Sequence, residues 1–122
     1  MLIAAALAAP SLAHAQEPQA LYLENCSACH KPNGLGVKGA FPALTGDATV
    51  LGDPAGAVGV VLNGRGGMPT FKTDLSDAQI ADILTYVRSA WGNNGGPVTT
   101  ADVAVARSRG PKPPPPRGLE AH

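Results

Sequence analysis

The strongest hydrophobic pattern in the chain runs through residues 76–91. Apolar side chains recur there at the spacing of one helix face, at Ile80, Ile83, Leu84, Val87 and Trp91. Ser76, followed three residues later by Gln79, matches a capping box, which satisfies free backbone N–H groups at a helix start. Gly92 ends the pattern. The sequence therefore predicts an amphipathic helix over residues 76–91.

Two weaker patterns predict two further helices. Residues 19–25 follow Glu17 and Pro18, and proline is tolerated in the first turn of a helix because its missing N–H would have no partner there. Asp53 is a good helix cap, and the apolar residues after it are spaced for a helix that runs to about Asn63. Gly64 then ends this helix.

The rest of the chain lacks a regular pattern. Apolar and polar residues do not alternate with the two-residue period of a strand. Between His30 and Asp53, helix-breaking residues are too frequent for regular structure, at Gly34, Gly36, Gly39, Pro42 and Gly46. We therefore expect an all-α fold with three or more short helices and long loops.

The first residues are typical of an export signal. Residues 2–9 form an unbroken apolar run, and Ala13 and Ala15 flank one position as signal peptidase prefers. The run is shorter than the roughly 20 residues that a membrane span needs, so we expect no stable membrane span. We interpret residues 1–15 as a signal peptide cleaved after Ala15, with the mature protein in a bacterial periplasm. A buried amino-terminal helix is the alternative.

The last residues form the basic end of the chain. From residue 101 onward, the basic residues Arg107, Arg109, Lys112 and Arg117 outnumber the acidic Asp102 and Glu120. Residues 111–116 are nearly all proline and predict an extended segment without a core. We expect residues 16–96 to form the folded domain and residues 97–122 a Pro-rich, basic, disordered tail. A sharper hypothesis is that the tail's charges steer docking onto an acidic partner.

One motif carries specific chemistry. Cys26, Cys29 and His30 form the pattern C-x-x-C-H, which is the signature of covalent haem attachment. Thiols three positions apart can each form a thioether bond to one of the two vinyl groups of a haem. The side chain that follows then reaches the iron, which makes His30 the proximal ligand.

Three other interpretations of the two cysteines are weaker. A thioredoxin-like redox pair needs a preceding strand, and the sequence predicts none. A zinc site needs four ligands. After cleavage the chain offers only His122, at its end, as a soft or imidazole donor in addition to Cys26, Cys29 and His30. A structural disulfide would close a very short loop and stabilise little.

Met68 is the candidate for the second axial ligand. It is the single methionine that follows the predicted cleavage site. It lies in a glycine-rich loop and precedes Pro69, so the backbone can approach a flat ring closely and then be fixed. A methionine is more often core filler, but the upstream motif favours ligation. Ligation by histidine and methionine raises the reduction potential and leaves no open position, which suits electron transfer.

The composition agrees with a haem protein. Only 4% of the residues are aromatic, so side chains alone would make a small core, and a haem would supply apolar volume. The formal net charge is +0, which argues against a partner such as nucleic acid.

Taken together, these residues resemble the class I (mitochondrial-type) cytochrome c family, in particular bacterial single-haem periplasmic cytochromes c. The resemblance covers residues 17–93 and implies a small cytochrome c fold wrapped around one covalent haem c. It further implies that the Pro42 carbonyl accepts a hydrogen bond from the His30 ring and that Leu44 packs on the haem. Arg65 is the candidate partner of a haem propionate.

The resemblance also implies how the first and last helices of the domain cross. Tyr22 would meet Ile83 and Tyr86 at that crossing.

These observations favour a periplasmic one-electron carrier that is not an enzyme. Its redox partners would be a periplasmic dehydrogenase as donor and an oxidase or another cytochrome as acceptor. The first alternative is a non-catalytic cytochrome c subunit of a dehydrogenase complex. The second is a small haem enzyme or gas sensor, which would need an open sixth position on the iron.

Overall fold

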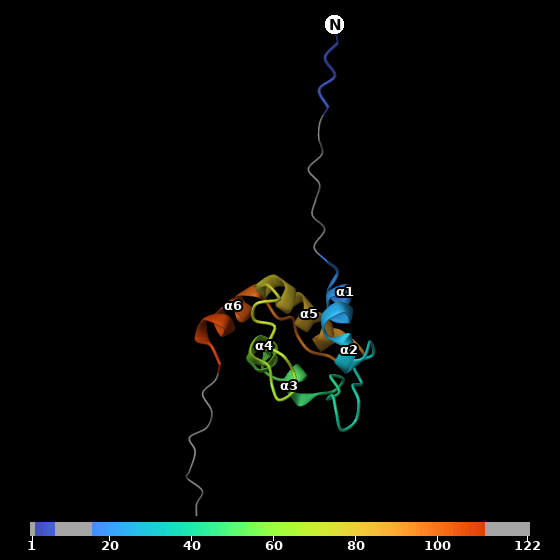
Figure 1. Ribbon diagram of the computed structural model, residues 1–122, viewed down its shortest axis with the longest axis vertical. Coiled ribbons are helices and arrows are strands. Elements are labelled where there is room, and N and C mark those ends of the chain that lie inside the picture. Colours follow the sequence, from blue (N-terminus) through green and yellow to red (C-terminus); the bar gives the residue numbers. More distant parts are fainter. Residues whose placement is uncertain (1, 7–15, 112–122) are drawn as a thin grey trace, which may run out of the picture.

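The computed structural model describes residues 2–6 and 16–111 (Figure 1). This part of the chain contains six helices: α1 (Pro18–Asn25), α2 (Ser27–His30), α3 (Ala48–Leu51), α4 (Pro54–Asn63), α5 (Asp77–Ser89) and α6 (Thr100–Arg109). Across these residues the extended pairings are isolated bridges, so the all-α prediction is confirmed. Most of the predicted signal peptide lies outside the described residues. No helix in the described ranges is both long and apolar enough to cross a membrane.

Helices α1 and α5 pack against each other, and α5 also packs against α6 (Figure 1). The ring of Tyr22 from α1 lies 5.5 Å from that of Tyr86, and Ile83 is buried in the same core cluster. The predicted crossing is therefore present. The capping box of Ser76 and Gln79 starts α5 as predicted.

Trp91 differs from its predicted place on the last turn of α5. The helix ends at Ser89, and Trp91 has a left-handed backbone with φ of 55°. Its ring still packs edge-on against Tyr22 at 5.1 Å between centroids. The spacing thus predicted a core position, but beyond the helix end.

Helix α4 has the predicted bounds. The Asp53 carboxylate accepts a hydrogen bond from the Ala55 N–H, and Gly64 ends the helix with φ of 75°. A Cβ at Gly64 would lie 2.6 Å from the Met68 carbonyl oxygen, so glycine lets the following loop fold back tightly.

The long segment before α4 is irregular except for α3, which the sequence pattern did not predict. A four-residue helix is too short to show a helical period, and its start depends on Asp47 accepting a hydrogen bond from the Val50 N–H. The buried guanidinium of Arg88 holds the end of α3 through the carbonyls of Val50 and Gly52, at 2.6 and 2.8 Å.

Helix α6 corrects the predicted boundary at residue 97. Thr99 and Asp102 form a second capping box, Val103 is completely buried, and α6 packs against both α4 and α5 (Figure 1). Residues 100–109 are therefore part of the fold and not a tail. The sequence did not indicate this because one buried valine among alanines and polar residues makes a weak pattern. The rest of the predicted tail, residues 112–122, lies outside the described residues.

Candidate functional site

The C-x-x-C-H motif occupies the junction between α1 and α2. Cys26 ends α1, and its N–H donates to the Tyr22 carbonyl at 2.8 Å. The following helical turn closes with a hydrogen bond of 3.0 Å from the His30 N–H to the Cys26 carbonyl. Both cysteines are half-buried, and they do not form a disulfide with each other. The turn therefore presents two thiols and one imidazole from adjacent positions of a single helical segment.

The environment of Cys26 argues against a redox-active pair. Burial, with a smaller contribution from Cys29, raises the pKa of the Cys26 thiol to about 11. A reactive redox cysteine has a lowered pKa, because the thiolate is the nucleophile. The zinc interpretation also lacks support, since no group of three His, Cys, Asp or Glu side chains within residues 2–6 and 16–111 could hold a metal ion.

The imidazole of His30 has a fixed orientation. The side chain is buried, with 8% of its surface exposed, and Nδ1 lies 2.9 Å from the Pro42 carbonyl oxygen. Because a carbonyl only accepts hydrogen bonds, Nδ1 must carry the hydrogen, and Nε2 keeps its lone pair for a metal. This is the contact that the family resemblance implies, and a fixed ring of this kind is typical of metal-ligating histidines.

Two aromatic side chains hold the backbone directly after His30. The Tyr22 hydroxyl donates to the Lys31 carbonyl at 2.6 Å, and the Trp91 indole N–H donates to the Pro32 carbonyl at 3.1 Å. Burial, followed by the nearby Cys26 and Tyr86, raises the pKa of Tyr22 above its usual range, so the hydroxyl remains a donor. The sequence predicted packing for these rings but not the hydrogen bonds, since carbonyl partners leave no mark on the sequence.

Met68 lies in the loop between α4 and α5. It is half-buried and exchanges backbone hydrogen bonds of 2.9 and 3.2 Å with Arg65, which is exposed. The structure thus brings Met68 together with Arg65, and His30 together with Pro42, as two separate pairs. Leu44 is half-buried against the core, and Asn93 holds its carbonyl at 3.1 Å.

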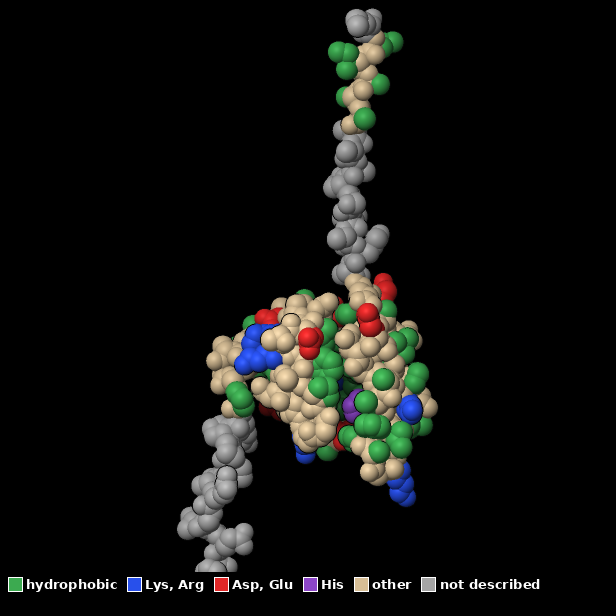
Figure 2. Space-filling view, viewed as in Figure 1, with side chains coloured by type: hydrophobic (Ala, Val, Ile, Leu, Met, Phe, Trp, Pro, Cys, Tyr) green, Lys and Arg blue, Asp and Glu red, His purple; other side chains and the backbone are tan. Residues whose placement is uncertain are grey.

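Apolar side chains surround this part of the surface. Cys26, Leu44, Val61 and Phe71 are half-buried against the core, and Phe41 is exposed. Hydrophobic side chains border a hollow in which a histidine side chain is visible (Figure 2). A cavity of about 480 Å³ lies along the loop of residues 35–43 that supplies Pro42. None of the two cysteines, His30 and Met68 lines this cavity. Two thiols, one oriented imidazole and one thioether nevertheless match the set of groups that hold a haem.

Comparison with known proteins identifies the family. The family model described as cytochrome C oxidase, cbb3-type, subunit III matches residues 13–87. The chain is 37% identical over 103 residues to the cytochrome c subunit of alcohol dehydrogenase (quinone) from Gluconobacter oxydans (strain 621H). The match covers 74% of this chain but 22% of that protein, so the chain spans about a fifth of its length. A cytochrome c-552 from Thermus thermophilus is 34% identical over 97 residues, with 67% of this chain and 66% of that protein covered.

Solved structures show the same fold. Cytochrome c6 from the diatom Phaeodactylum tricornutum superposes with a TM-score of 0.50 at 23% identity, covering 74% of this chain and 94% of that one. The c-type cytochrome XoxG from Methylobacterium extorquens AM1 gives 0.51 at 24% identity, covering 75% and 64%. The chain therefore belongs to the cytochrome c family, in the group described as cytochrome C oxidase, cbb3-type, subunit III, whose members carry electrons on a covalently bound haem c.

Proposed function

We propose that this chain is a periplasmic one-electron carrier in which Cys26 and Cys29 join one haem c through thioether bonds. His30 and Met68 would ligate its iron. The observation that carries the proposal is the hydrogen bond of 2.9 Å between His30 Nδ1 and the Pro42 carbonyl, which leaves Nε2 free for iron. When bound, the haem supplies an iron that gains one electron to become Fe(II) and loses it to return to Fe(III).

The chain's own residues tune this chemistry. Pro42 fixes the His30 ring, Leu44 would pack on the haem from its half-buried place against the core, and the soft thioether of Met68 would favour Fe(II) and so raise the reduction potential. Arg65, exposed beside Met68, would pair with a propionate. If His30 and Met68 both ligate the iron, no position would remain for a substrate, and the chain would act as a carrier and not as an enzyme.

The redox partners would be a periplasmic dehydrogenase as donor and an oxidase or another cytochrome as acceptor. The names of the relatives support these two classes, because they include dehydrogenase cytochrome c subunits and the cbb3-type oxidase subunit CcoP of Azospirillum brasilense. Export by a signal peptide cleaved after Ala15 would place the carrier in the same compartment.

A second candidate function is a non-catalytic cytochrome c subunit of a periplasmic dehydrogenase complex. The similarity to the dehydrogenase subunit of Gluconobacter oxydans favours it. Purification of the tagged protein from its own host distinguishes the two functions. A stoichiometric catalytic subunit that stays bound through gel filtration indicates the complex, and a free small protein indicates the carrier.

Spectra of the protein, expressed with haem maturation enzymes, test the axial ligands. The reduced wild-type protein should not bind carbon monoxide at neutral pH, whereas Met68→Ala should bind it readily because the sixth position is open. Leu51→Ala, which shortens an exposed side chain outside the proposed ligand set, is the control and should behave as wild type. Ready binding by the wild type would contradict the carrier and favour a haem enzyme or gas sensor.

A further inference from the structure

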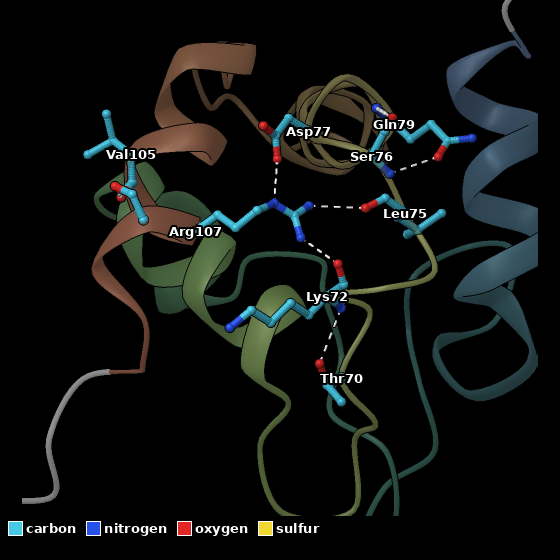
Figure 3. Close-up of polar contacts among 9 residues, drawn as sticks. Thr70, Lys72, Leu75, Ser76, Asp77, Gln79, Val105 and Arg107 are labelled. Carbon is cyan, nitrogen blue, oxygen red and sulfur yellow. Dashed lines mark hydrogen bonds and ion pairs between the residues drawn. The ribbon is translucent and has the colours of Figure 1, made fainter.

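Arg107 connects α6 to the segment that leads from Met68 to α5. Its Nε donates to the Asp77 carboxylate at 2.7 Å, and its Nη2 donates to the Leu75 carbonyl at 3.1 Å. Its Nη1 donates to the Lys72 carbonyl (Figure 3). One guanidinium thus holds three acceptors of a single segment, which its planar set of donors allows and a lysine ammonium would not reproduce.

The same segment is also hydrogen-bonded to α4. The Phe71 N–H donates to the Val61 carbonyl at 3.0 Å, and the Thr70 hydroxyl donates to the Leu62 carbonyl. The loop that carries Met68 is therefore anchored to α4 directly after the methionine, and Arg107 anchors it again before α5 begins.

Helix α6 is built to present Arg107 to this segment. Val103 lies four residues before Arg107, on the same face of α6, and is completely buried. The Thr99 capping box fixes the start of the helix. Val105 lies on the other side of α6 and points away from the cluster (Figure 3). The matched family model ends at residue 87, so this anchor comes from residues beyond it.

We propose that Arg107 is a positioning residue that keeps Met68 in place as the iron ligand, an inference that rests on the proposed function. A thioether is a weak donor, so its occupancy of the iron depends on how narrowly the protein restricts its loop. Gly64, Gly66 and Gly67 give this loop more conformational freedom than other residues would. Without Arg107 the loop samples more positions, and an external ligand competes more easily with Met68.

Imidazole binding to the oxidised, full-length holoprotein tests the proposal. Arg107→Gln should bind imidazole about tenfold more tightly than wild type, as expected when a charge-assisted hydrogen bond to the loop is lost. As the pH is raised, Arg107→Gln should also lose the sulfur-to-iron charge-transfer absorption at a lower pH than the wild type does. Arg109→Gln is the matched control, because Arg109 is exposed and lies two positions away on a different face. It should behave as wild type.

The outcomes separate this inference from the proposed function. Met68→Ala should bind imidazole most tightly, and if it binds no better than wild type, Met68 is not the ligand and the proposed function fails. If Met68→Ala responds but Arg107→Gln matches Arg109→Gln, only the role of Arg107 is overturned. A lower melting temperature with unchanged imidazole affinity, measured where all variants are folded, would also overturn it. If Arg107→Gln does not fold, Arg107→Lys must show the tighter binding, and wild-type affinity in that variant rejects the proposal.

Discussion

Replacing Val103 with alanine should lower the free energy of unfolding by about 2 kcal/mol. Val103 is completely buried where α6 packs on the rest of the fold. The substitution removes two methyl groups from the core, worth about 0.8 kcal/mol each, and the space that the neighbours fill only in part adds about 1 kcal/mol. Alanine's better helix propensity returns up to about 0.7 kcal/mol. A net loss of about 2 kcal/mol follows.

Urea unfolding of the holoprotein measures this loss. With a slope of about 1–3 kcal/mol per molar urea, the midpoint should fall by about 1 M. Val105→Ala is the matched control, because it makes the same change on the same helix at a side chain that is 47% exposed. It should shift the stability by less than about 0.5 kcal/mol. Equal midpoints for the two variants would refute the packing of α6 and restore the interpretation of these residues as a tail.

Three further substitutions test local features. In urea unfolding, Gly36→Ala should lower the stability more than Gly39→Ala. Both substitutions place an alanine at positive φ, which costs about 1–2 kcal/mol, but a Cβ at Gly36 would also clash with two backbone carbonyls. Equal midpoints would show that the loop yields freely. Tyr22→Phe should cost about 1–2 kcal/mol by thermal unfolding, because it leaves a carbonyl acceptor without its donor, and Tyr86→Phe is the comparison that should cost less. The Thr99 N–H at the start of α6 donates to the Asp102 carboxylate and holds its pKa below the usual range. The ionised carboxylate therefore stabilises the fold fully above the ordinary carboxyl pKa, and this stabilisation is lost as the pH falls through the lowered pKa. The difference in stability between wild type and Asp102→Asn should therefore vanish in acid, and a constant difference across pH would reject this reasoning.

The sequence predicted the features that depend on neighbouring residues. Helices α4 and α5 start at caps that are readable in the sequence, and the motif of Cys26, Cys29 and His30 is itself a local spacing. Each of these signals comes from a few adjacent positions, so no knowledge of the tertiary fold was needed. The hydrogen bond between His30 and Pro42 came from the family resemblance, since the loop between the two residues does not dictate it.

The features that were missed depend on long-range contacts. Helix α6 has a single fully buried side chain, Val103, so its hydrophobic pattern is too weak to indicate that it packs on a core. Arg107 reads as a basic surface residue until the fold brings Asp77, far earlier in the chain, beside it. It is therefore engaged within the fold and is not one of the free charges that the docking hypothesis requires. Arg88 also carries no sign of burial in the sequence, yet it is buried among backbone carbonyls.

The intact mass of the purified protein under denaturing conditions tests the central claim most directly. Expressed with haem maturation enzymes, the wild-type chain should retain the mass of one haem after unfolding, because two thioether bonds hold it. The double variant Cys26→Ala, Cys29→Ala should show the mass of the polypeptide alone, and Ser27→Ala, which keeps both thiols and their spacing, should retain the haem. A wild-type protein that unfolds to the bare polypeptide mass, with its pigment extracted by acid acetone, would contradict covalent attachment at Cys26 and Cys29.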